Sequence, residues 1–166
     1  MPEKQTRERA REDAAEGKAP TTQAGEFVRE EMDHVREGKH GARSTKQLIA
    51  IGLSKARRAG VKLPPPKPGT TSEATRQRAA RDVRKGRSGR TRKPSPSRSR
   101  AVRGALRREG RSAASPKAVA RQAHTSARRR TPAQRSAAAR KAAHTKGPAG
   151  RSAAARKAAR TRAARA

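Results

Sequence analysis

The sequence lacks the residues from which small proteins usually build a stable interior. It has no cysteine, tryptophan or tyrosine, and Phe27 is its single phenylalanine among 166 residues. The missing cysteines exclude disulfides and thiolate metal sites. Large apolar side chains must offset a chain-entropy cost of roughly 1–2 kcal/mol per residue, and most of the apolar fraction here is alanine, which buries little area. The composition therefore predicts a mostly disordered chain.

Acidic residues are also scarce, and this sets the charge. Only 13 Asp and Glu accompany 45 Lys and Arg, which gives a formal net charge of +32. Residues 1–63 hold 14 basic and 10 acidic residues, whereas residues 64–166 hold 31 basic and 3 acidic ones. So basic a chain attracts polyanions, and salt weakens the attraction. The sequence therefore predicts polyanion binding by the second segment.

Long apolar runs are missing as well. The longest, Leu48 to Leu53, is far too short to cross a membrane. No apolar segment follows Met1, so the sequence predicts no signal peptide. These absences together predict a cytoplasmic protein.

Proline marks the expected division of the chain. The prolines of residues 64–69 favour an extended polyproline II linker. Before it we expect a charged segment at residues 1–21, either a frayed helix or disordered, and a small all-α helical hairpin at residues 22–63. After it, residues 70–166 are expected to form a disordered basic tail.

Apolar residues recur at helical spacing in two stretches of the expected hairpin, residues 24–35 and 48–56. Ser44, with Gln47 three residues later, is typical of a helix N-cap, and Gly60 of a C-terminal stop.

The expected hairpin is small for an independent fold, so it is either dynamic or paired with a second copy in a homodimer. Gly52 lies within its second apolar stretch and costs about 1 kcal/mol of helix stability relative to alanine. Close approach of the two helices would offset that cost. A merely tolerated glycine is the alternative.

The tail contains an internal repeat. RSAAARKAAHT at residues 135–145 recurs as RSAAARKAART at residues 151–161. Alanine, arginine and lysine favour helix once phosphates neutralise the charges. We therefore expect the repeats to become helical on binding, as two pieces separated at Gly147-Pro148. A tail that stays disordered while bound is the alternative.

The clustered Lys and Arg residues of the tail are the candidate nucleic-acid contacts. Neutralising phosphates with such residues releases counterions and binds DNA without reading its sequence. The candidate residues are Arg87, Arg90, Arg92, Lys93, Arg98, Arg100, Arg128, Arg129, Arg130, Arg135, Arg140, Lys141, Arg151, Arg156, Lys157, Arg160 and Arg162.

A second candidate anion site surrounds the start of the second expected helix, where free N–H groups attract phosphate. It consists of Lys39, His40, Arg43, Ser44 and Lys46. A solvated basic turn is the alternative.

A candidate metal site consists of Asp33, His34, Glu37 and His40, which lie close together in the sequence. His34 and Glu37 fall on a helix and His40 beyond its end, with no obvious fourth ligand, so solvated surface residues are the preferred interpretation. We expect no metal and no cofactor. Without a P-loop or nucleophile elbow, we also expect no catalytic residue, so the protein is predicted not to be an enzyme.

Residues 27–60 resemble a small uncharacterised bacterial family. They contain GKH at residues 38–40 and STKQLIAIGLSKARRAG at residues 44–60, close to that family's GKH…SxKQAIAIGLSxARxAG core. Leu48 stands where alanine is usual. The resemblance implies a bacterial origin and no particular activity. The tail is similar in composition to the Ala/Lys-rich arms of linker histones and bacterial histone-like proteins.

The charge and the tail together predict sequence-independent DNA binding by a nucleoid-associated, histone-like protein that coats or condenses DNA. One alternative is an RNA- or ribosome-associated accessory protein, and another is an adaptor that docks to acidic partners. The scarcity of large apolar residues in the tail argues against membrane insertion. The lack of aromatic residues argues against specific recognition of single strands.

Overall fold

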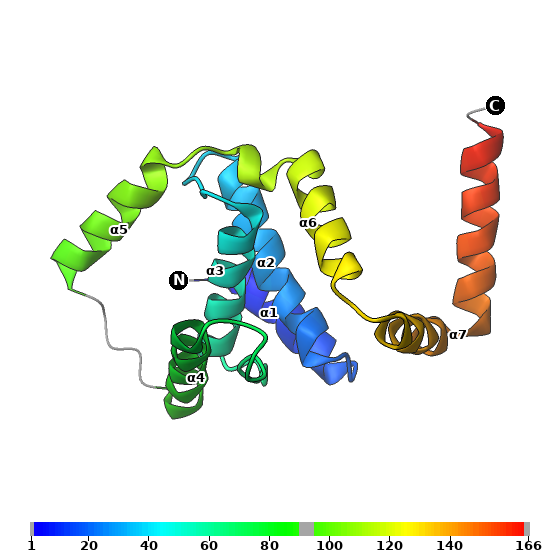
Figure 1. Cartoon of the computed structure of the whole chain (residues 1–166), viewed down its shortest axis with the longest axis horizontal. Coiled ribbons are helices and arrows are strands. Elements are labelled where there is room, and N and C mark those ends of the chain that lie inside the picture. The colour runs from blue at the N-terminus through cyan, green and yellow to red at the C-terminus, as the bar shows by residue number, and fades with distance from the viewer. Residues whose placement is uncertain (1, 90–94, 165–166) are drawn as a thin grey trace. The chain divides into compact units, whose positions relative to one another are not determined.

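The computed structural model describes residues 2–89 and 95–164, and this part of the chain is all-α (Figure 1). It contains seven α-helices, one short 3-10 helix and no strand, and its helical content is 76%. The expected fold class, a mostly disordered chain with one small hairpin, is therefore wrong. Contacts divide the chain into two compact units, residues 1–122 and residues 123–166.

Two helices, α2 (Pro20–Arg36) and α3 (Thr45–Arg58), pack together as the central hairpin of the first unit. Ser44 is the N-cap of α3, as predicted, and its side chain accepts a hydrogen bond from the backbone N–H of Gln47. Gly60 follows the last turn with φ 96°, the left-handed geometry that glycine favours beyond a helix C-terminus.

Gly52 lies at a close approach of α3 to α2. A Cβ atom at this position would come within 2.7 Å of Val28 Cα and 3.0 Å of the Phe27 carbonyl oxygen. The close approach of the two helices is therefore confirmed, because no side chain fits at residue 52 without moving the α2 backbone.

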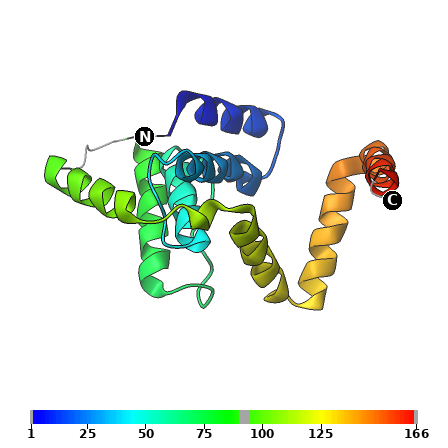
Figure 2. The same cartoon turned by 90° about the horizontal axis from the view of Figure 1, so that it is seen from above.

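A further helix, α1 (Lys4–Ala15), lies alongside α2 (Figure 2). Thr6 and Ala10 are buried in this contact, and Arg9 Nε lies 3.0 Å from Glu26 Oε2. Of the two conformations considered for residues 1–21, the structure has the helix. Its small buried residues explain why no apolar periodicity is visible in the sequence.

Helix α4 (Glu73–Ser88) packs against α3, although it lies in the expected tail. Ala79 is buried, and Ser54 donates a hydrogen bond of 2.6 Å to Asp82 Oδ2. A Cβ on Gly86 would lie 2.0 Å from the Arg57 carbonyl oxygen. Small residues thus allow α4 to contact α3 almost backbone to backbone.

The end of α5 (Pro96–Arg108) and the residues directly after it contact the connector between α2 and α3. The backbone N–H of Gly41 donates to the Leu106 carbonyl at 2.9 Å, and that of Ala42 donates to the Gly110 carbonyl at 3.0 Å. Two stretches more than 60 residues apart in the sequence are therefore joined by backbone hydrogen bonds.

The 3-10 helix η1 (Ser112–Ala114) completes this contact. Ala113 and Ala114 are buried, the Thr45 hydroxyl donates to the Ala113 carbonyl at 2.7 Å, and Arg36 Nε donates to the Ala114 carbonyl at 3.1 Å. Because these bonds satisfy buried backbone oxygens, η1 closes the connector end of the hairpin.

The core consists of two small clusters in which alanine predominates. The first contains Ala10, Ala24, Phe27, Ala56 and Leu63. The second contains Val35, Ala42, Leu48, Ala113 and Ala114. Alanine allows helices to approach closely, so a few large side chains are enough to fill the interior. Composition alone does not reveal such a core, because a single alanine side chain buries little area.

Four serine or threonine residues begin the helices of the expected tail. Ser72, Ser95 and Thr131 are side-chain N-caps of α4, α5 and α7 (Pro132–Ala163), and Ser115 Oγ accepts from the Ala118 N–H at the start of α6 (Pro116–Arg128). Proline follows three of them directly, a pattern that favours helix initiation. The disorder predicted for residues 70–166 is therefore wrong for the described residues.

Gly147 interrupts α7. Its φ of 64° and ψ of 173° are not helical, and Pro148 follows it. The two copies of the repeat, at residues 135–145 and 151–161, lie on either side of this break. The predicted break at Gly147-Pro148 between two helical pieces is confirmed, whereas the coupling of helix formation to binding stays a prediction.

Candidate nucleic-acid interface

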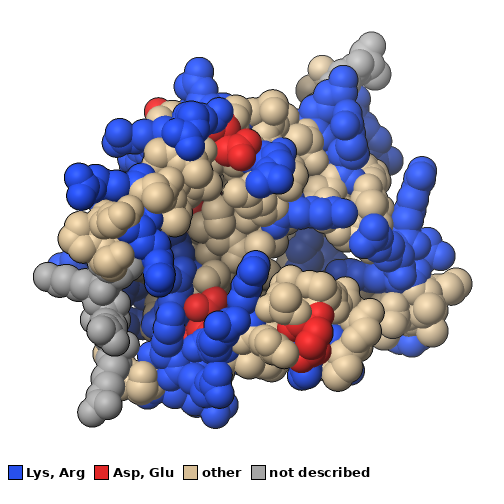
Figure 3. Space-filling model, turned by 60° about the vertical axis from the view of Figure 1, so that its left-hand side comes forward, with Lys and Arg blue, Asp and Glu red and all other residues tan. Residues whose placement is uncertain are grey.

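The candidate tail residues that the structure describes are all exposed. Arg98 and Arg100 lie on α5, Arg128 ends α6, and the residues from position 135 onward lie on α7. Arg90, Arg92 and Lys93 lie outside the described residues. Lys and Arg side chains are spread over much of the face shown in Figure 3, and acidic patches on it are small.

The three acidic residues after position 63 all interact with basic residues. Glu73 accepts two hydrogen bonds of 2.8 Å from Arg76, and these bonds hold the pKa of Glu73 below its usual value. Asp82 lies 3.6 Å from Arg58 of α3, and Glu109 lies 3.7 Å from Arg43 of the connector. Two of the three thus contact the hairpin and help to hold α4 and the residues around Glu109 on it.

Beyond Glu109 the sequence contains no acidic residue at all. The Lys and Arg residues of α7 therefore have no acidic neighbour in their own segment to neutralise them. None of the described residues 123–164, which belong to the second unit, is buried. This segment presents an exposed, uncompensated positive charge along a helical backbone.

The repeat places its basic residues on two sides of each helical piece. At roughly 100° per residue, Arg151 and Arg162 project on one side, whereas Arg156, Lys157 and Arg160 project on the opposite side. The equivalent positions of the first copy hold Arg135 and Lys146 on one side and Arg140, Lys141 and His144 on the other. Each piece can therefore contact anions on two sides at once.

The candidate anion site at the start of α3 is not assembled as a group. Lys39 Nζ lies 3.0 Å from Glu37 and 3.2 Å from Glu3, and these carboxylates raise its pKa. The hydroxyl of Ser44 accepts from Gln47.

Of the remaining three residues, His40 faces the acidic interior rather than the start of α3. Arg43 and Lys46 are exposed, and Arg43 lies 3.7 Å from Glu109.

A partly buried polar cluster lies beneath this connector, and the sequence analysis did not identify its central residue. Glu31 is 1% exposed, and its carboxylate contacts His34 of the same helix and His40 of the connector. The two histidine side chains are 13% and 18% exposed, so they are not solvated surface residues. Asp33 and Glu37, considered with them in the sequence, instead lie near Arg36 and Lys39 at the surface.

Other charged groups surround the cluster. Lys55 of α3 contacts the Glu31 carboxylate closely and lies 3.1 Å from Glu30 Oε1. Glu3 Oε1 lies 2.9 Å from His34 Nε2 and 3.2 Å from Lys39 Nζ. The hydrogen bonds from His34 and then Lys39 hold the pKa of Glu3 below its usual value. No period in the sequence marks Glu31, because its role depends on Lys55 and the connector.

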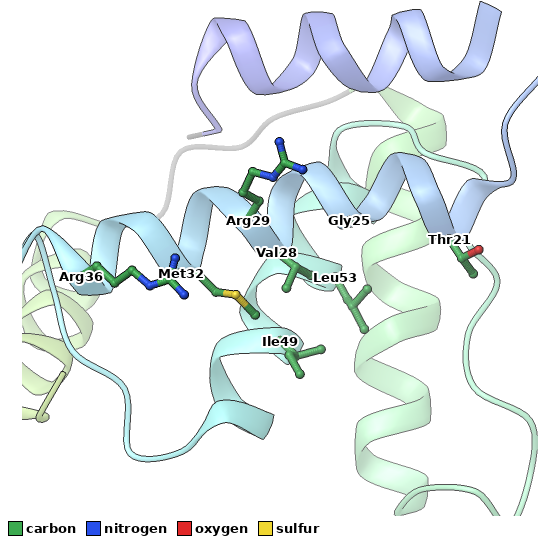
Figure 4. A pocket seen from close by; sticks show the side chains of 8 residues that line it. All are labelled: Thr21, Gly25, Val28, Arg29, Met32, Arg36, Ile49 and Leu53. Atoms are coloured by element: carbon green, nitrogen blue, oxygen red, sulfur yellow. The ribbon is translucent and has the colours of Figure 1, made fainter. Parts of the chain in front are cut away.

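An apolar groove lies on another side of the hairpin (Figure 4). Val28 and Met32 of α2 and Ile49 and Leu53 of α3 line it, and its volume is about 450 Å³. These four side chains are partly exposed. A homodimer through the hairpin stays a prediction.

No helix in the described part of the chain has the length and apolar character that a membrane crossing requires. A family model described as "Family of unknown function (DUF6496)" matches residues 21–67, which span α2, the connector and α3. This segment is similar to that family and covers well under half of the chain. No curated protein and no solved structure matches the chain.

Proposed function

We propose that the protein binds duplex DNA without sequence preference through the Arg- and Lys-rich segment that includes α5, α6 and α7. The observation that carries this proposal is the exposed basic charge of the described residues 110–164, in a part of the sequence that contains no acidic residue. Phosphates that neutralise such side chains release condensed counterions, and this release drives binding to any sequence.

The helical form of the repeats favours DNA over duplex RNA. An α-helix with its side chains is about 10–12 Å across, close to the roughly 12 Å width of the B-DNA major groove. A helix in this groove has phosphates on two sides, and Arg151 and Arg156 project on opposite sides of the second piece. The major groove of A-form RNA is too narrow for side chains to read.

The proposed role is that of a nucleoid-associated protein of the bacterial cytoplasm, with binding rather than catalysis as its activity. The alanines between the basic residues support close contact, because they leave room for the helix backbone to approach the phosphates. The first unit, which contains the α2–α3 hairpin, would then hold the binding segment in place. Any recognition of a partner beyond charge would come from this unit.

The test uses the salt dependence of DNA affinity. In one variant Arg140, Lys141, Arg156 and Lys157 become Gln; in the matched control Lys4, Arg11, Arg29 and Lys62 become Gln, which removes the same charge from the first unit. If each tail residue contacts one phosphate, the slope of log K against log salt should become shallower by about 3–4 in the first variant. The control should keep the slope of the unmodified chain.

Equal slopes in the two variants would show that the repeats do not contact phosphate. The affinities are measured by fluorescence anisotropy with a labelled DNA duplex, and the same measurement with unlabelled competitors compares DNA with RNA. We expect unlabelled duplex DNA to displace the labelled duplex at a lower concentration than duplex RNA does. Stronger displacement by RNA would contradict the proposed preference and favour an RNA-associated role.

A further inference from the structure

We propose that Glu31, His34 and His40 form a binding site for a divalent transition-metal ion such as Zn²⁺. One ligand atom from each residue lies within 4.8 Å of the others. Zinc binds histidine nitrogen at about 2.0–2.1 Å and carboxylate oxygen at about 2.0–2.2 Å, which puts two ligands of a tetrahedral site about 3.3–3.5 Å apart. Glu31 Oε2 lies 3.4 Å from His40 Nε2, which is within that range. His34 Nδ1 lies 3.6 Å from Oε1, the other oxygen of the same carboxylate, which Lys55 also contacts.

The outward-facing nitrogens of both histidines are held in the way that metal ligands usually are. His40 Nδ1 lies 3.0 Å from the Gly41 carbonyl oxygen, and His34 Nε2 lies 2.9 Å from the carboxylate of Glu3. A carbonyl or an ionised carboxylate can only accept, so each of these nitrogens carries the proton. Such hydrogen bonds to the second ring nitrogen fix the tautomer and orientation of metal-binding histidines.

The inward-facing nitrogens can take a metal ion in place of protons. When His34 and His40 are neutral, with their outer nitrogens protonated, the inner nitrogens direct lone pairs toward the ionised Glu31 carboxylate, which also only accepts. Acceptors facing one another repel. A metal ion among the three groups would satisfy all of these lone pairs at once, and a single divalent ion supplies the charge that two additional protons would.

The surroundings suit a metal with an open position. Lys55 contacts Oε1 of Glu31 and also binds Glu30, so Oε2 of Glu31 is left for the ion. The histidines are partly exposed, which gives an ion a path from solvent and leaves room for a water molecule as the fourth ligand. Two imidazoles and one carboxylate form a ligand set typical of zinc and related first-row metals.

Metal binding would stabilise the first unit. His34 is near the end of α2, His40 is in the connector that bonds to residues 106–110, and Glu3 precedes α1. An ion would therefore link segments that otherwise depend on a small alanine-rich core. This inference does not rest on DNA binding, because the ligands belong to the hairpin unit and not to the basic segment.

The test uses the full chain, stripped with EDTA and titrated with Co²⁺ as a spectroscopic probe. We expect one equivalent of Co²⁺ to produce the visible absorption of a tetrahedral site, and Zn²⁺ to displace it. Excess Zn²⁺ should raise the melting temperature, because it binds only the folded state. His34→Gln and His40→Gln should each abolish the absorption, and Glu3→Gln should weaken binding about 10–100-fold.

A double variant of the two exposed histidines outside the hairpin, His124→Gln with His144→Gln, is the matched control and should keep the absorption unchanged. Far-UV circular dichroism establishes that each variant is folded, and either hairpin variant is sufficient if the other loses helix. The proposal is overturned if the full chain gives no saturable absorption. It is equally overturned if the absorption persists in folded His34→Gln or His40→Gln, or disappears in the tail double variant.

Discussion

Residues 73–114 and residues 123–164 are both rich in arginine and alanine, yet only the first of these segments contributes described residues to the core. Ala79, Ala113 and Ala114 of the first segment are buried, whereas no described residue of the second is buried. The first segment also has Asp82 and Glu109, which lie near Arg58 and Arg43 of the hairpin. The second has no acidic residue and no valine, leucine, isoleucine, methionine or phenylalanine.

The comparison teaches that in this protein a few small and acidic residues decide whether a basic segment packs. An alanine or glycine permits backbone contact, and an acidic residue compensates a neighbouring cation. Where both are present the segment joins the hairpin unit. Where acidic residues are absent, the same kind of helix keeps its charge exposed, as DNA binding would require.

The largest effect is expected from Gly41→Ala. A Cβ at this position would lie 1.8 Å from the Glu109 carbonyl oxygen, so the segment at residues 106–114 must shift or detach. We expect a loss of about 1–3 kcal/mol in the free energy of unfolding, measured by urea denaturation, and faster trypsin cleavage after Arg107 and Arg111.

The matched control for this substitution is Gly25→Ala. Gly25 lies within α2, and a Cβ there would meet no atom within 4 Å. We expect a gain of about 0.5–1 kcal/mol, because alanine favours helix over glycine. If both variants lost the same stability, the contact between residues 41 and 109 would not be what holds residues 106–114 on the connector.

A smaller effect is expected from joining the two pieces of α7 with Gly147→Ala and Pro148→Ala together. These changes remove the left-handed glycine and the proline that interrupt the helix. Helical signal should rise by circular dichroism, while the urea midpoint of the first unit should stay the same. A shifted midpoint would show that the second unit contributes to the hairpin core.

The smallest effect is expected from Glu3→Gln, and it should depend on pH. Hydrogen bonds from His34 and Lys39 lower the pKa of Glu3 in the folded state, so its contribution is present above the unfolded pKa and is lost as pH falls through the folded one. The unmodified chain should therefore melt higher than Glu3→Gln at pH 7, and the difference should shrink as the pH falls below the ordinary pKa of a glutamate and through the lower folded-state pKa of Glu3. A constant difference would exclude the carboxylate as its cause.

Local signals allowed much of the hairpin to be predicted. Three helix boundaries depend on a property of one residue and its near neighbours, and all three predictions are confirmed. They are the boundaries at Ser44, Gly60 and Gly147. The N-caps of the tail helices carry the same kind of signal, in Ser95-Pro96 and Thr131-Pro132. These N-caps did not lead to a prediction of helix, because side-chain size and charge, which both predict disorder, were given more importance than helix initiation.

The sequence by itself determined the charge distribution, the hairpin and the break between the two repeats, since each depends on composition or on residues within one or two helical turns. Only the tertiary structure decided that residues 106–114 pack on the connector and that Glu31, not Asp33, lies with His34 and His40. Those contacts join segments far apart in the chain. Their selection depends on how closely backbones can approach, and no local pattern encodes that distance.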